Sequence, residues 1–159
     1  MNDREFFRSR VQAEAKGFRK VFEALPADRM EYRPHPKSPS AAEVMRTMAA
    51  ELAACMDAVD HGRVEWEPAP PTSRDDMLAR WDKAQADLAS RLEGLDDAAW
   101  ERPVQMSSGG KAYPPMPVGA FLWFLLFDAI HHRGQLTAYI RPMGGKVPGV
   151  YGRSADEKP

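Results

Sequence analysis

The sequence has little cysteine and almost no net charge. Cys55 is the single cysteine, so no disulfide can form within the chain, and a reducing compartment is consistent with this. The 22 basic and 23 acidic residues leave a formal net charge of −1. Such a balance disfavours the electrostatic binding of nucleic acid. We therefore expect a cytoplasmic protein with no nucleic-acid partner.

Long hydrophobic runs are also missing. The most apolar run, residues 118–130, is interrupted by Asp128 and is too short to span a bilayer, which is typical of a buried core helix. The N-terminal stretch MNDREFFRSR has charges on both sides of two phenylalanines and lacks the apolar core of a signal peptide. We expect no membrane partner.

Apolar residues at steps of three and four predict four helices and no convincing strand. The predicted helices cover about 3–25, 40–60, 73–93 and 117–143, followed by a tail at 144–159. Ser40 and Ser73 each begin a capping-box pattern. We also expect one helical turn at 96–100 and a loop at 107–117. These elements predict a single all-α domain, 1–159, folded as a four-helix bundle. The connections are long enough to permit crossover topology.

The fourth predicted helix carries a polar stripe within its apolar sequence. At 100° per residue, Asp128, His132, Gln135 and Tyr139 fall on one face. An Asp and a His four residues apart on a helix can chelate one divalent ion. The simpler alternative is a hydrogen bond in which Asp128 orients the imidazole. The spacing alone leaves both alternatives open.

Two segments resemble a known family. The stretch HHRGQLTAYIRPMGGKVPGVYGRSADE, residues 131–157, strongly resembles the DinB-like family of helical-bundle metalloproteins. The stretch RPHPKSPSAAEVM, residues 33–45, is similar to that family's entry into its second helix. The resemblance implies a four-helix bundle with crossover connections and a homodimer. It also implies that a thiol cofactor could take part, because some relatives use one in transferase or isomerase reactions.

The resemblance further implies a metal site in which the family uses three histidines. The equivalent positions here are Thr47, Asp128 and His132, so only His132 matches. In one interpretation the site is remodelled, and Asp128 and His132 bind zinc or nickel with Thr47, Glu51 or water completing the shell. In the other interpretation the metal is lost and a polar cleft remains.

The principal functional expectation is a small-molecule-binding or stress-related module with this degenerate metal site. The alternative is a metal- or thiol-dependent transferase or hydrolase that uses the remodelled Asp/His site. Gln135, Tyr139 and His131 are the candidate cofactor contacts, and the pattern assigns no catalytic residue, substrate or reaction. Gly134, inside the fourth helix, suggests close approach of another helix.

Overall fold

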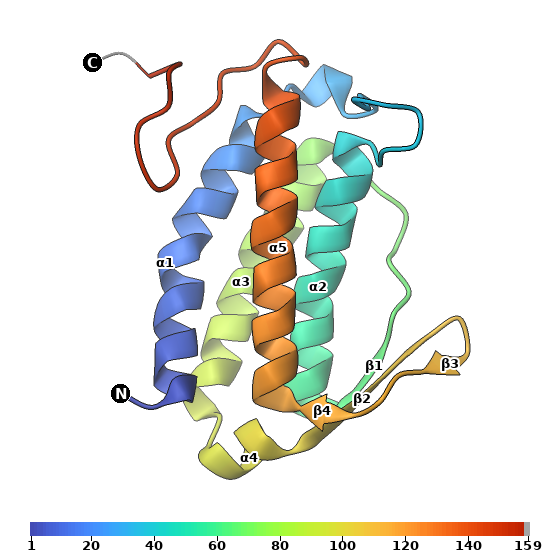
Figure 1. Cartoon of the computed structure of the whole chain (residues 1–159), viewed down its shortest axis with the longest axis vertical. Coiled ribbons are helices and arrows are strands. Elements are labelled where there is room, and N and C mark those ends of the chain that lie inside the picture. Colours follow the sequence, from blue (N-terminus) through green and yellow to red (C-terminus); the bar gives the residue numbers. More distant parts are fainter. Residues whose placement is uncertain (158–159) are drawn as a thin grey trace.

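The computed structural model describes residues 1–157, and most of them are helical (Figure 1). The four long helices are α1 (Asp3–Ala24), α2 (Ala41–His61), α3 (Arg74–Gly94) and α5 (Val118–Ile140). Their bounds lie close to the four ranges expected from the apolar spacing, apart from the end of α5, which comes earlier. A mostly helical fold is therefore confirmed. None of these helices is both long and apolar enough to cross a membrane.

The four helices pack side by side with long connections between them. α1 and α2 each contact both α3 and α5, so consecutive α1 and α2 occupy opposite corners of the bundle. In Figure 1, α1 and α5 run upward whereas α2 and α3 both run downward. The chain after α2 must therefore return along the whole bundle before α3 begins. This return is the crossover that the long connections permit.

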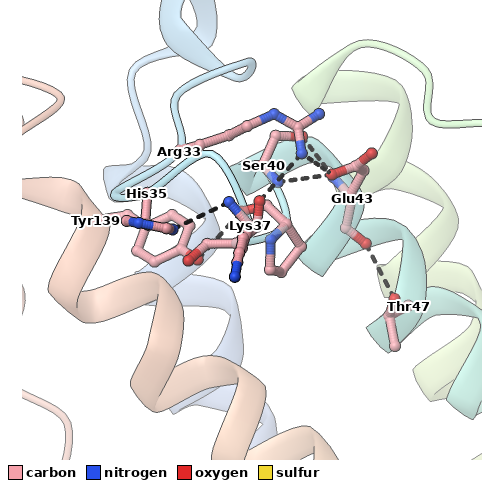
Figure 2. A network of polar contacts seen from close by, with 9 residues as sticks. Arg33, His35, Lys37, Ser40, Glu43, Thr47 and Tyr139 are labelled. Carbon is pink, nitrogen blue, oxygen red and sulfur yellow. Dashed lines mark hydrogen bonds and ion pairs between the residues drawn. The ribbon is translucent and has the colours of Figure 1, made fainter.

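A polar network fixes the start of α2 (Figure 2). The side chain of Ser40 accepts from the backbone N–H of Glu43, and the Glu43 carboxylate accepts from the backbone N–H of Ser40. Arg33 donates to the same carboxylate at 2.7 Å. The Tyr139 hydroxyl donates to the Pro39 carbonyl at 3.1 Å, which ties this loop to α5. The network thus sets how α2 lies against α5.

A small sheet lies at one end of the bundle, and the expectation of no strand was wrong. Its strands are β1 (Arg63–Glu65), β2 (Pro103–Ser108), β3 (Lys111–Ala112) and β4 (Met116–Pro117). β1 pairs with β2 in parallel, and β3 and β4 pair with β2 antiparallel. The expected loop at 107–117 is therefore partly a hairpin. Three of the four strands have only two or three residues, too short for apolar alternation to reveal them.

Two shorter helical elements complete the fold. The helical turn expected at 96–100 is α4 (Asp97–Glu101), whose N-cap is Asp96. A 3₁₀ turn, η1 (Ala27–Arg29), follows α1. Both elements lie at the ends of the bundle, as Figure 1 shows. They leave the long faces of α2 and α5 to form the site described below.

The tail after α5 is held against the bundle by a buried ion pair. Arg133 donates to Glu14 at 2.7 Å, and both side chains are 3% exposed. The Tyr151 hydroxyl, in the tail, donates to the same Glu14 carboxylate at 2.8 Å. The expected tail extends to residue 159, and its last two residues lie outside the described part of the chain. This anchor joins the first helix, the last helix and the tail.

Candidate metal centre

Three side chains that can bind metal meet between α2 and α5. Glu51 comes from α2, and Asp128 and His132 come from α5. One ligand atom from each lies within 4.8 Å of the other two. Nε2 of His132 is 3.4 Å from Oε1 of Glu51 and 3.8 Å from Oδ2 of Asp128. The imidazole nitrogen therefore faces both carboxylates.

The local structure explains why these residues converge. Asp128 and His132 are four residues apart on α5, so they project from the same face one turn apart. α2 packs along α5, and its Glu51 points inward with only 2% of its surface exposed. The side chains of His132 and Asp128 are 19% and 40% exposed. The cluster thus extends from the interior of the bundle to its surface.

Glu51 is the electrostatically costly member of the cluster. Neither of its carboxylate oxygens has a hydrogen-bond partner among the described residues. Burial, and then the negative charge of Asp128, raise its pKa to about 9. A buried acid without partners is destabilising when it is ionised, so it takes up a proton or pairs with a cation. The site therefore favours the uptake of positive charge.

Gln135 orients the imidazole of the cluster. Nδ1 of His132 lies 3.0 Å from Oε1 of Gln135, one turn further along α5. In the tautomer that carries the imidazole proton on Nδ1, His132 donates to this amide oxygen. The lone pair of Nε2 then points toward Glu51 and Asp128. Histidines that bind metal are commonly held by such a hydrogen bond at the other ring nitrogen.

The donor set fits a divalent first-row metal ion. Two carboxylates and one imidazole are ligands that zinc and nickel accept. The unpaired oxygens of Glu51 are the features that an ion would satisfy. Three protein ligands leave a further position open, which is typical of catalytic rather than structural sites. The exposed edge at Asp128 provides access to such a position.

The structure brings two of the three predicted metal ligands together and gives the third a different contact. Asp128 and His132 come together, and the α2 residue that joins them in the cluster is Glu51. The Thr47 hydroxyl instead donates to the carbonyl of Glu43 in its own helix, at 3.1 Å (Figure 2). From the sequence, Glu51 is expected only as a substitute ligand, because one turn of α2 separates it from the family position. A metal contact by Thr47 stays a prediction.

The three candidate cofactor contacts have different surroundings. Gln135 contacts His132, as described above. Tyr139 is buried, and its hydroxyl bonds to Pro39. His131 is exposed, and its ring centroid lies 5.4 Å from that of His132. Tyr139 thus has a structural partner, whereas His131 stays open to solvent beside the cluster; cofactor binding by any of the three stays a prediction.

Several known proteins resemble this chain. A curated relative, the uncharacterized protein YrdA of Bacillus subtilis, is 48% identical over 42 residues, which is about a quarter of each chain. A DinB-like protein from Bacillus cereus has a similar structure, with a TM-score of 0.75, 22% identity and coverage of 92% of this chain and 97% of that one. At such identity the likeness shows the fold alone.

Two further structures have described activities of their own. YfiT from Bacillus subtilis is described as a probable metal-dependent hydrolase with an unusual four-helix bundle topology. Its TM-score is 0.67 at 12% identity, over 90% of this chain and 89% of YfiT. The mycothiol-dependent maleylpyruvate isomerase has a TM-score of 0.57 at 10% identity, over 89% of this chain and 61% of the isomerase.

A match over most of the sequence shows to which family the chain belongs. A family model described as the DinB superfamily matches residues 10–136. This range includes α2, the small sheet and α5 as far as Leu136, and so every residue of the cluster. The expected resemblance is confirmed, and the chain belongs to the DinB superfamily.

Proposed function

We propose that this chain is a divalent-metal-dependent enzyme of the hydrolase or transferase type, with Glu51, Asp128 and His132 as the metal ligands. The observation that carries the proposal is the buried, unpartnered carboxylate of Glu51, 3.4 Å from the imidazole of His132. A purely structural cluster would have to keep this acid protonated, as a buried carboxyl group without a hydrogen-bond partner. YfiT, described as a probable metal-dependent hydrolase, has the same fold and supports the proposal.

Each residue of the cluster has a separate role in this proposal. Glu51 supplies negative charge from the interior, where a low dielectric strengthens its attraction for a cation. His132 supplies a neutral nitrogen whose direction Gln135 fixes. Asp128 binds at the solvent edge. A bound ion would lower the pKa of a water or thiol at its open position and so make it a nucleophile.

A thiol co-substrate is supported by the fold shared with the mycothiol-dependent isomerase. The chain's own thiol is unsuitable, because Cys55 is 5% exposed and burial, followed by the charge of Glu51, raises its pKa. A buried thiol with a raised pKa yields little of the reactive thiolate. Any thiol in the reaction must therefore come from a separate molecule that enters at the exposed edge.

The competing proposal is a metal-free module that binds a small molecule. In that case Glu51 keeps its proton and the three side chains form a polar cleft wall. The two proposals differ in one measurable property, which is the binding of a stoichiometric amount of metal. The unpartnered oxygens of Glu51 favour the metal.

The test begins with elemental analysis of protein purified without chelator. We then titrate the chelator-treated protein with Zn²⁺ and Ni²⁺ by calorimetry. We expect one ion per chain in the wild type and loss of binding in Glu51→Gln and His132→Ala. His61→Ala is the matched control, because this exposed histidine at the end of α2 lies outside the cluster.

The outcomes separate the two proposals. Stoichiometric binding that only the cluster variants lose supports the metal-dependent enzyme. A wild-type protein that binds neither ion, with no gain in melting temperature on adding them, overturns it and favours the module. The metal-bound protein is then assayed for the rate at which it hydrolyses activated esters. Rates with and without an added low-molecular-weight thiol compare the hydrolase and transferase classes.

A further inference from the structure

A second cavity, of about 370 Å³, lies between α2, the first half of α3 and the segment that connects β1 to α3. This connecting segment, residues 66–73, runs along the outside of α2 in Figure 1. The volume is in the range of pockets that bind small molecules. None of the three residues of the metal cluster lines the cavity, so it is separate from the candidate metal centre.

One end of the cavity has hydrogen-bond donors without acceptors. Nε of Arg46 and the hydroxyl of Thr72 are both buried, and neither has a hydrogen-bond partner among the described residues. Glu43, one turn before Arg46, pairs with Arg33 instead. Arg80 also lines the cavity and forms no ion pair within the described chain. Because a buried donor without an acceptor costs free energy, this end favours an anionic ligand group.

The fold places these three donors at the same end of the bundle. α2 and α3 both begin at the upper end in Figure 1 and run in the same direction. Arg46 is the sixth residue of α2, and Arg80 is the seventh residue of α3. Thr72 directly precedes Ser73, the N-cap of α3. Two positive charges and a hydroxyl therefore gather where the two helices start.

The opposite end of the cavity is acidic. Asp57 follows Arg46 by eleven residues on α2, which is about 16 Å along the helix at about 1.5 Å per residue. Glu67 lines the cavity from the connecting segment, two residues after β1. Both carboxylates are exposed, and neither forms an ion pair with a described residue. This end therefore attracts a positive group and repels a second negative one.

The wall between the charged ends is mostly apolar. Ala50 and Ala53 contribute small side chains from α2, and Pro70 and Pro71 contribute rings from the connecting segment. Small side chains leave room beside the helix. The middle of the cavity therefore fits an uncharged, extended body.

We infer that this cavity binds a short peptide, or a zwitterion of similar length, with its carboxylate at Arg46, Thr72 and Arg80. The amino group of the ligand lies at the acidic end, beside Asp57 and Glu67. Guanidinium groups bind carboxylates with two parallel hydrogen bonds. An extended peptide rises about 3.4 Å per residue, so four residues with a hydrogen bond at each end bridge the cavity. The inference does not depend on the candidate metal centre.

The first test titrates the protein with tetra-alanine by calorimetry and follows the backbone amides of Ala50 and Ala53 by NMR. We expect the free peptide to bind and to shift both amide signals. Amidation of its carboxylate, or acetylation of its amino group, should each weaken binding about tenfold, because each removes a hydrogen bond between charged groups. A free peptide that does not bind, or a doubly blocked peptide that binds equally well, overturns the inference.

Arg46→Met and Thr72→Val separate binding from folding. Each variant keeps most of the apolar bulk and removes a buried donor that the described chain does not satisfy, so the free energy of unfolding should hold or rise. We expect tetra-alanine to bind about tenfold more weakly to each variant. Arg29→Met is the control, because Arg29 is exposed in η1 and outside the cavity. Lower stability with unchanged peptide binding would make both donors structural and contradict the inference.

Ala53→Leu tests the cavity itself. Ala53 is exposed on α2, and leucine favours helix almost as well as alanine, so the fold should be kept. The larger side chain occupies the middle of the cavity and should abolish peptide binding. Ala79→Leu, at an exposed position of α3 outside the cavity, is the control. Zinc titration of the same variants keeps this result distinct from the metal proposal, because the cavity and the cluster share no residue.

Discussion

Oε1 of Glu51 lies 3.4 Å from Nε2 of His132, across the contact between α2 and α5. The carboxylate is buried and accepts no hydrogen bond from the described residues, whereas the imidazole is held from its far side by Gln135. A cation between them would satisfy the acid and accept the nitrogen lone pair. Through this contact, the folding stability of the protein should depend on the pH and on whether a metal ion is bound.

The stability of the metal-free protein should fall as the pH rises from about 4.5 to 9. The pKa of Glu51 is raised from 4.5 to about 9 in the folded chain, so folding takes up a proton between these values. The stabilisation is complete below the unfolded pKa and is lost as pH rises through the folded pKa. The slope from this group is about 1.4 kcal/mol per pH unit at most. Urea unfolding at several pH values measures it.

Glu51→Gln provides the comparison for that pH series. The amide keeps the shape but does not titrate, so the slope from this group should disappear and the variant should gain stability above pH 8. Equal slopes in wild type and variant would contradict the pKa assigned to Glu51. The variant should also lose metal binding, which calorimetry on the same samples records.

Gln135→Ala should weaken metal binding without unfolding the protein. The change removes the hydrogen bond to Nδ1 of His132, so the ring is free to turn and to carry its proton on Nε2. Loss of such a partner commonly lowers metal affinity roughly 10–100-fold. Zinc titration measures the effect, with the exposed Gln12→Ala as the control. Unchanged affinity would remove Gln135 from the site.

Arg133→Met should destabilise the fold by about 3–5 kcal/mol, because it leaves the buried Glu14 without its main cation. Burial alone would raise the pKa of Glu14, but Arg133, Tyr151 and Arg10 together lower it. Their stabilisation is therefore present above the unfolded pKa and is lost as pH falls. Denaturant unfolding measures the loss. Arg141→Met, at an exposed ion pair, should change stability little.

Gly119→Ala should destabilise the start of α5. A Cβ at this position would lie 2.2 Å from the ring of Trp100, which is itself buried. One of the two elements must move, and overpacking of this kind costs about 1–3 kcal/mol. Gly94→Ala is the control, since its Cβ meets nothing within 4 Å. Thermal unfolding of the two variants compares the effects.

The sequence alone predicted the four long helices, because their apolar spacing and the caps at Ser40 and Ser73 are local features. It also placed Asp128 and His132 on one face, since a separation of four residues fixes that relation within a helix. These properties depend on residues close in the chain.

Tertiary structure decided which α2 residue joins the cluster. The contact of Glu51 with His132 depends on how α2 lies along α5, which one turn of displacement would change. The small sheet likewise forms because distant segments meet, as in the pairing of Val64 with Met106. Local patterns set which residues share a face, but only packing sets which faces meet, because its contacts join residues far apart in the chain.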